Sequence, residues 1–126
     1  MDGDVITLDT DWAPDITIDY TADLLAEAGV KATWFITHDS PATRRLLDSE
    51  WFDIGLHPNF SPSTTQGANP EAVIKHLKAI APNAKLARAH SLALSFRHLE
   101  LMSGFGLESD HSIYLPRASG IQPVLH

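Results

Sequence analysis

The chain of 126 residues contains no cysteine, which excludes both disulfides and thiolate metal ligands. Basic residues are also few, with nine Lys and Arg against sixteen Asp and Glu, for a formal net charge of −7. That balance disfavours binding to a phosphate backbone, so no nucleic-acid partner is expected. The sequence has no apolar run near the roughly 20 residues of a membrane span. It also lacks the glycine-rich loops that bind nucleotide phosphates.

Length and composition predict one globular domain over residues 1–126, because 44% of the residues are hydrophobic and 20% are charged. The chain is short for a closed α/β barrel, which typically needs about 200 residues or more. Its N-terminal segment lacks the basic and apolar regions of a signal peptide, so a cytoplasmic location is the expectation.

Short apolar segments alternate with segments of helical periodicity along the chain. This alternation predicts an α/β fold in which about five strands form a parallel sheet. The first helix is expected to place Tyr20, Leu24, Leu25 and Ala28 on one face. No regular structure is expected for the tail. The expected strands are 5–8, 32–37, 52–56, 84–87 and 107–109, and the expected helices are 14–28, 41–47, 70–81 and 93–103.

Polar side chains recur where the expected strands end. In a parallel sheet these ends open onto one side of the fold, so residues distant in sequence converge there. Carboxylates and imidazoles gathered in this way are the ingredients of a metal-assisted hydrolase. The residues concerned are Asp9, Asp11, His38, Asp39, His57, Asn59, Arg88, His90, Asp110 and His111.

The residue types suggest a division of roles. Asp9 and Asp11 could act as a base and a metal ligand, or simply form a solvated acidic turn. His57 and His90 could be metal ligands, and Arg88 could orient a carboxylate or form a surface ion pair. With N and O ligands, zinc is the commonest expectation, while nickel, cobalt and iron stay open.

Other polar and aromatic residues are weaker candidates. His38 and His111 could contact substrate or serve as substitute proton donors. Trp12 could form a wall of the pocket or belong to the core. His76 and His98 are expected in the middle of helices, and neither is assigned a role.

Four segments together resemble the polysaccharide deacetylase family, the NodB-homology or carbohydrate esterase 4 type. Residues 6–12 (I-T-L-D-T-D-W) resemble its first motif, and residues 29–35 (G-V-K-A-T-W-F) resemble a strand common in the family. Residues 52–57 (F-D-I-G-L-H) resemble the strand leading into the metal-binding motif, and residues 87–91 (A-R-A-H-S) occupy the place of the third motif. The combination is most similar to the WbmS-like subgroup, which is associated with O-antigen biosynthesis.

This resemblance implies an irregular (β/α)7 barrel, of which the chain supplies an N-terminal part. It implies Asp9 as general base, Arg88 as the residue that orients it, and Asp11 and His57 as metal ligands. The family's second metal histidine is replaced by Ser61, so the third ligand is either His90, which we favour, or Asn59.

The implied function is metal-dependent removal of an N-acyl group from a sugar or polysaccharide precursor. The main alternative is an inactive or truncated deacetylase-like domain that binds carbohydrate or a protein partner. A receiver-like signalling domain is disfavoured, because His57 stands where such a domain needs an aspartate. An open sheet edge would also suit a homo-oligomer.

Overall fold

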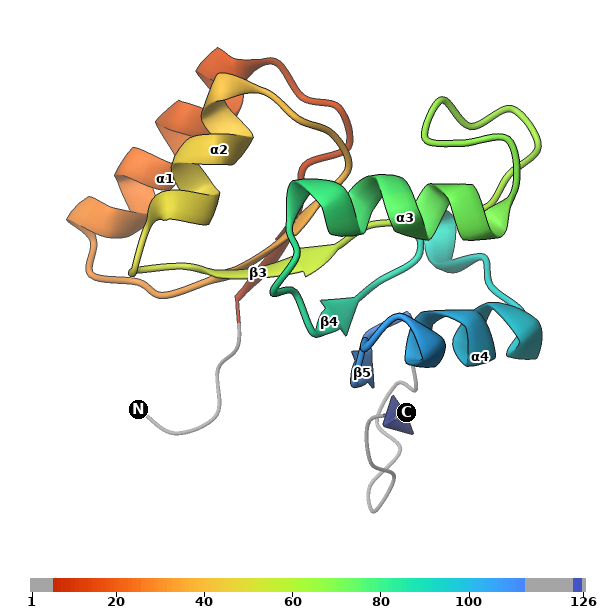
Figure 1. Cartoon of the computed structure of the whole chain (residues 1–126). Helices are drawn as coiled ribbons and strands as arrows, with labels where there is room; N and C mark the ends of the chain where they lie inside the picture. Colours follow the sequence, from red (N-terminus) through yellow and green to blue (C-terminus); the bar gives the residue numbers. More distant parts are fainter. Residues whose placement is uncertain (1–5, 113–123, 126) are drawn as a thin grey trace.

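The computed structural model describes residues 6–112 and 124–125. Strands and helices alternate through most of this part (Figure 1), as the sequence predicts. The elements in chain order are β1 (Thr7–Asp9), α1 (Asp15–Glu27), β2 (Thr33–Ile36), α2 (Pro41–Asp48), β3 (Asp53–Leu56), α3 (Pro70–Ile80), β4 (Leu86–Ala87), the 3₁₀ turn η1 (His90–Leu92), α4 (Phe96–Gly104), β5 (Ser109–Asp110) and β6 (Val124–Leu125).

The strands form one sheet in the order β1-β2-β3-β4-β5-β6. The first five run parallel to one another, which confirms the predicted βα-repeat fold. The sixth pairs antiparallel with β5, placing Val124 opposite Asp110. The expectation of a tail without regular structure is therefore wrong at this strand.

Local sequence signals explain where two of the helices begin. Ser40 and Thr43 form a capping box ahead of α2, with Pro41 in its first turn. Asn69 caps α3 by accepting a hydrogen bond from the backbone N–H of Ala72. Pro70 is in the first turn of α3, as Pro41 is in the first turn of α2. These helix starts agree with the sequence-based expectation.

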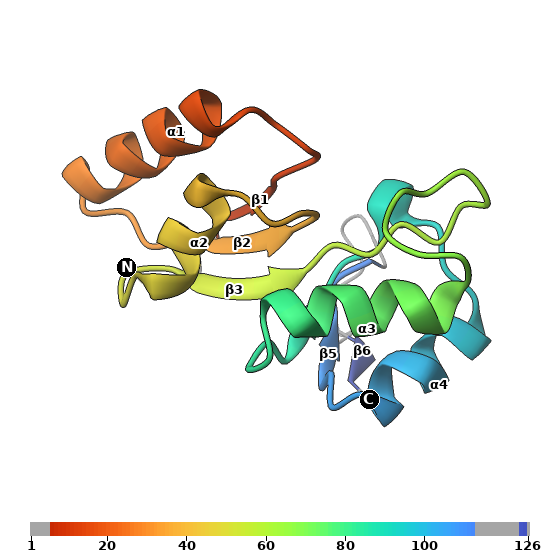
Figure 2. The same ribbon diagram turned by 45° about the horizontal axis from the view of Figure 1, so that its top comes forward.

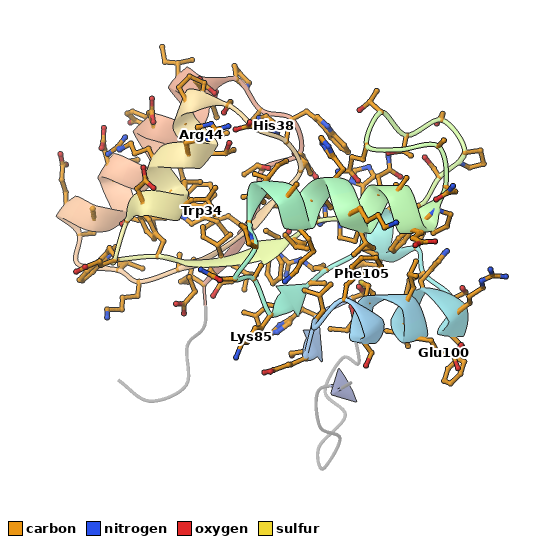
Figure 3. The ribbon with its side chains drawn as sticks, viewed as in Figure 1. Trp34, His38, Arg44, Lys85, Glu100 and Phe105 are labelled. Atoms are coloured by element: carbon orange, nitrogen blue, oxygen red, sulfur yellow. The ribbon has the colours of Figure 1, made fainter. Side chains whose placement is uncertain are left out.

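Two hydrophobic clusters fix the helices on the sheet. The first joins α1 and α2 to β2, and Trp34 lies buried within it, beneath these helices (Figure 3). The second joins α3 and α4 to β3 and β4, and includes Leu56, Ile74 and Met102. Figures 1 and 2 show the same division, with α1 beside α2 and α3 beside α4.

The buried face of α1 differs from the predicted one. Ile18 and Ala22 are the buried residues, whereas Tyr20 and Leu24 are 65% and 49% exposed. Helix α2 packs beside α1 (Figure 2), and the small side chain of Ala22 allows a close approach between them. None of the helices in the described ranges is long and apolar enough to cross a membrane.

The fourth helix begins later than predicted. Residues 90–92 form a 3₁₀ turn, and α4 begins only at Phe96, after the cap Ser95. His98 is therefore in the first turn of the helix instead of its middle. There its Nδ1 accepts a hydrogen bond from the backbone N–H of Ser95, at 3.0 Å.

Candidate metal centre

The carboxyl ends of three parallel strands bring one carboxylate and two imidazoles together. Asp11 follows β1, His57 follows β3 directly, and His90 comes shortly after β4. Oδ1 of Asp11 lies 3.0 Å from Nε2 of His57 and 3.4 Å from Nδ1 of His90. The two imidazole nitrogens are 3.4 Å apart. These three atoms form a nearly equilateral triangle.

The triangle has the dimensions that a small divalent cation needs. Zinc–nitrogen and zinc–oxygen bonds of about 2.0–2.2 Å in a tetrahedral site place neighbouring ligand atoms about 3.3–3.5 Å apart. His57 is 2% exposed, while the side chain of Asp11 is 55% exposed. Three protein ligands on a site open to solvent on one side are typical of a catalytic zinc centre.

The imidazole of His57 has the tautomer that metal binding requires. Its Nδ1 lies 2.5 Å from the backbone carbonyl oxygen of Arg88, which can only accept a hydrogen bond, so Nδ1 carries the proton. Nε2 then presents its lone pair toward Asp11 and His90. Burial lowers the pKa of His57, while Asp9 and the hydrogen bond to Arg88 act in the opposite direction. Burial therefore favours the neutral imidazole, the form that binds metals.

The turn that carries Asp11 has an unusual backbone. Asp11 and Trp12 have φ angles of 45° and 58°, in the left-handed region that side chains other than glycine rarely adopt. The hydroxyl of Thr37 accepts a hydrogen bond from the backbone N–H of Trp12 at 3.0 Å and lies 2.9 Å from the hydroxyl of Thr10. Both threonines are at most 2% exposed. This buried pair holds the strained turn in place.

The loop after His57 is tied to the sheet by Gln66. This side chain is 4% exposed, and its amide donates to the carbonyl oxygens of Thr37 and His57 at 3.0 and 3.2 Å. Its own oxygen accepts from the backbone N–H of Asn59 at 2.6 Å. Gln66 thereby links the ends of β2 and β3 on either side of the histidine.

A second carboxylate lies beside the triangle and is held by an arginine. Nε and Nη2 of Arg88 donate to Oδ1 of Asp9 at 2.9 and 2.6 Å, and Nη1 donates to the hydroxyl of Thr7 at 3.0 Å. The guanidinium lies 4.4 Å from the ring centroid of Phe35. Gly55 permits this arrangement, because a Cβ there would come within 2.6 Å of the Phe35 ring. Oδ1 of Asp9 also lies 3.7 Å from Nδ1 of His57.

Trp12 and His38 lie at the same edge of the sheet. The Trp12 ring meets the ring of His90 edge-on, with centroids 5.2 Å apart, and it is 37% exposed, so it forms a wall of the site and not part of the core. His38 follows β2 (Figure 3), and its Nδ1 lies 2.7 Å from the hydroxyl of Thr37. Burial lowers its pKa, while Asp15 and Asp39 act in the opposite direction. Within the described residues, His38 is not part of the converging triangle.

His111 and Asn59 also lie outside the triangle. The His111 ring centroid is 5.5 Å from that of Phe35, and burial and then the charge of Arg88 lower its pKa, against a smaller opposite effect of Asp110. The side-chain oxygen of Asn59 accepts from the backbone N–H of Ser61 at 3.0 Å. Of the two proposed third ligands, His90 is the one with a nitrogen at a corner of the triangle.

Sequence reasoning missed the residues that support this site. Thr10 and Thr37 carry a detectable signal, because each is next to a predicted site residue at a strand end. Phe35 and Gly55 are opposite each other in the register of β2 and β3, which could be anticipated only once that pairing is known. Gln66 carries no comparable signal, because it follows a polar loop without periodicity.

Comparisons with known proteins identify the family and the fold of this chain. The family described as WbmS-like polysaccharide deacetylase matches residues 6–126. One similar solved structure is the crystal structure of WbmS from Bordetella bronchiseptica, described as a predicted polysaccharide deacetylase involved in O-antigen biosynthesis. It matches this chain with a TM-score of 0.82 and 33% sequence identity. The match covers 93% of this chain and 49% of WbmS. None of the curated proteins matches this chain.

A second solved structure shares the fold alone. It is BA3943 from Bacillus anthracis, a CE4 family pseudoenzyme, with a TM-score of 0.58 and 13% identity over 84% of this chain and 41% of that one. The chain thus spans about half the length of the solved structures it matches. Since the family match includes nearly every residue and WbmS shares the fold at 33% identity, the chain belongs to the WbmS-like polysaccharide deacetylase family.

Proposed function

We propose that this chain holds the metal-binding half of a carbohydrate N-deacetylase, which hydrolyses the amide of an N-acylated sugar. The observation that carries this proposal is the triangle of ligand atoms from Asp11, His57 and His90, with sides of 3.0, 3.4 and 3.4 Å. Membership of the polysaccharide deacetylase family supports a carbohydrate as the substrate.

The three residues of the triangle would hold a divalent cation, for which zinc is the best fit to one carboxylate and two imidazoles. When bound, such a cation supplies a Lewis acid that polarises the acyl carbonyl and lowers the pKa of an attacking water. Nickel, cobalt and iron are compatible with the same donor atoms. The N–H at Nδ1 of His57 keeps donating its hydrogen bond to the Arg88 carbonyl oxygen, so the imidazole keeps its orientation throughout.

Asp9 is the general base in this proposal. Its Oδ1 accepts two hydrogen bonds from Arg88, which fix the orientation of the carboxylate beside His57. Oδ2 accepts no hydrogen bond from the described residues and can take the proton of the attacking water. Arg88 is therefore a positioning residue and Asp9 the group that touches the reacting water.

Three further residues complete the proposed site. Trp12 forms a wall beside His90 and excludes water from one side of the substrate. His38 follows β2 and His111 follows β5, and both can contact the substrate or donate a proton to the leaving amine.

The serine at position 61, where the family's motif has its second metal histidine, favours a second candidate, a deacetylase-like domain that binds carbohydrate without turnover. Measurements of metal binding and of hydrolysis distinguish the deacetylase from the binding domain. After chelator treatment, the chain is titrated with zinc and the bound metal is counted by elemental analysis. Acetate release is then measured from N-acetylated sugars. We expect near-stoichiometric zinc that is lost in His57→Ala and His90→Ala but kept in Asn59→Ala.

The exposed His76→Ala variant is the control for removing an imidazole outside the triangle. Zinc with acetate release supports the deacetylase. Zinc without release on any acetylated sugar supports the binding domain. If the unmodified chain binds no zinc, nickel, cobalt or iron, the metal-dependent proposal is overturned.

A further inference from the structure

Helix α1 carries apolar side chains on two opposite faces. Ile18 and Ala22 are buried in the cluster that joins α1 and α2 to β2. On the other face, Ile16, Tyr20 and Leu24 are 79%, 65% and 49% exposed. Each residue turns a helix by about 100°, so Tyr20 points about 160° away from Ala22. A helix that is apolar all round is normally buried on all sides, so the outer face of α1 lacks a covering partner among the described residues.

The outer apolar residues form a straight ridge. Ile16, Tyr20 and Leu24 follow one another at intervals of four residues, and side chains at this spacing are neighbours on a helix surface. The same spacing led the sequence to predict Tyr20 and Leu24 on a buried face. Helix α1 lies at the outside of the fold, with α2 packed beside it (Figures 1 and 2). A ridge of this kind packs into the groove of a second helix, so a helix is the element that fits it.

One flank of the ridge is acidic. An Asp or Glu follows each ridge residue at the third position, so all three acids lie on the same side of the ridge. The residues on the opposite flank are Thr and Ala, which carry no charge. A partner that covers the ridge therefore meets negative charge along one side, and the complementary charge on that partner is positive. The acidic residues are Asp19, Asp23 and Glu27, and the neutral ones are Thr17, Thr21 and Ala28.

The fold neutralises this acidic flank only in part. Arg45 of α2 forms ion pairs with Asp19 and Asp23, whereas no described basic residue pairs with the exposed Glu27. Glu27 is the last residue of α1, where the helix dipole disfavours a negative charge, and the last turn has no basic residue. Helix stability therefore does not explain this carboxylate, while an ion pair with a basic partner would.

A second copy of the chain is a poor partner for the ridge. Two copies related by a two-fold axis would pair their α1 helices antiparallel, with Tyr20 next to its symmetry mate. The same axis would bring the acidic flank of one helix against the acidic flank of the other. These like charges repel, and the net charge of −7 on each chain adds to the repulsion. The acidic flank therefore favours a different protein of opposite charge.

We propose that the outer face of α1 is a docking surface for a basic amphipathic helix of a partner protein. The apolar side of that helix would cover the ridge of Ile16, Tyr20 and Leu24. Its Lys or Arg side chains would lie against Asp23 and Glu27. The inference concerns an interaction of this chain and does not depend on metal binding or hydrolysis at the triangle.

The test is an NMR titration of the whole chain with designed helical peptides of about 20 residues. All of them carry the same apolar stripe, and its flank is Lys and Arg in one set, Gln in a second and Glu in a third. The position of the flank around the helix is varied within each set. A scrambled Lys/Arg peptide has no stripe. We expect a basic amphipathic peptide to shift the Tyr20 ring and Leu24 methyl resonances and to bind at least ten-fold more tightly than the acidic and scrambled peptides.

Variants of α1 separate the apolar and charged contributions. Tyr20→Ala with Leu24→Ala removes most of the ridge, keeps a strong helix former at both positions and should weaken the basic peptide at least ten-fold. Phe96→Ala, which removes an exposed ring from α4, should have no effect. Glu27→Gln should weaken binding about two- to five-fold and reduce its dependence on salt. Glu100→Gln, at an exposed position of α4, is the charge control.

Sedimentation of the chain alone tests the second copy as the occupant. The docking surface is supported if the chain is monomeric and the basic peptide binds at Tyr20 and Leu24 with the expected preference. It is overturned if no basic amphipathic peptide shifts these residues, if acidic peptides bind equally well, or if the double variant leaves binding intact. A dimer that Tyr20→Ala with Leu24→Ala dissociates would assign the ridge to a second copy and also overturn the proposal. Zinc binding at the triangle is measured separately, so either result can fail without the other.

Discussion

The backbone carbonyl of Arg88 accepts a hydrogen bond from Nδ1 of His57 at 2.5 Å, and the Arg88 side chain holds Asp9. One residue thus supports the proposed metal ligand through its main chain and the proposed base through its guanidinium. The two functions can be separated by mutation, because a side-chain substitution leaves the carbonyl in place.

Arg88→Ala should retain zinc binding and lose activity. The carbonyl still fixes His57, while Asp9 loses two hydrogen bonds and its orientation, so kcat should fall roughly 10²-fold or more. Arg88→Lys replaces a forked donor with a single point charge and should recover only part of this loss. Zinc titration and acetate release on the same samples check the prediction. Loss of zinc binding in Arg88→Ala would contradict the separation of roles.

Gly55→Ala should destabilise the fold. Its Cβ would lie 2.6 Å from the Phe35 ring and 3.0 Å from the carbonyl oxygen of Leu86. The ring is fully buried, so the neighbours cannot move away freely and the cost should be about 1–3 kcal/mol. Urea denaturation measures this loss as a lower free energy of unfolding.

Two controls test the cause of that loss. Gly104→Ala, where nothing lies within 4 Å of the new Cβ, should be neutral or stabilising by up to about 1 kcal/mol. Phe35→Leu relieves the contact, so the double variant should lose less stability than the sum of the single losses. Additive losses would show that the ring is not the obstacle.

The sequence allowed a good prediction of the fold class, which follows from periodicity. The common direction of parallel strand ends also predicted that Asp11, His57 and His90 lie close together, as they do, while their role as metal ligands stays a prediction. It did not identify the buried face of α1, where apolar spacing alone favoured Tyr20 and Leu24. The face is decided by tertiary packing, because α1 lies against α2 and Ala22 shares a buried cluster with Ala42 and Leu46 of that helix. The two-residue strand at Val124 is too short for an alternation pattern to reveal.

The residues that hold the site in place were harder to predict than the candidate metal ligands. A metal ligand has a restricted chemistry, so aspartate and histidine at strand ends stand out from the sequence. A supporting residue such as Gln66 uses an ordinary amide, and its role depends on a loop whose path is fixed by tertiary contacts. Long-range hydrogen bonds of this kind leave no pattern in a single sequence.

Thr37→Val should weaken both the fold and the metal site. Valine keeps the shape of the side chain but removes the acceptor for the backbone N–H of Trp12 and the partner of Thr10. Leaving these buried groups unpaired should cost about 1–3 kcal/mol. Because the same turn carries Asp11, zinc affinity should fall about 10–100-fold. Thr65→Val, at an exposed loop position, is the matched control; an equal effect there would contradict a specific role of Thr37.

The pKa of His98 should respond to its stacking partner. Burial, and then the charge of Arg97, lower this pKa below the ordinary imidazole value. Phe60→Ala removes the stacked ring and admits water, so the pKa should rise toward about 6.5. Arg97→Gln should also raise it, by a smaller amount. NMR titration of the imidazole protons measures these shifts, and an unchanged midpoint in Phe60→Ala would contradict burial by the stack as the cause.

The lowered pKa of His98 also predicts how stability changes with pH. The unfolded chain binds this proton at a higher pH than the folded chain, so the contribution of His98 to stability is present above about pH 6.5 and is lost as the pH falls through the folded pKa. Protonation of Nδ1 would also remove the acceptor for the backbone N–H of Ser95. His98→Gln keeps a capping acceptor and cannot titrate. Its urea midpoint should therefore fall less between pH 7 and pH 5 than that of the unmodified chain, whereas equal falls would assign the acid sensitivity to other groups.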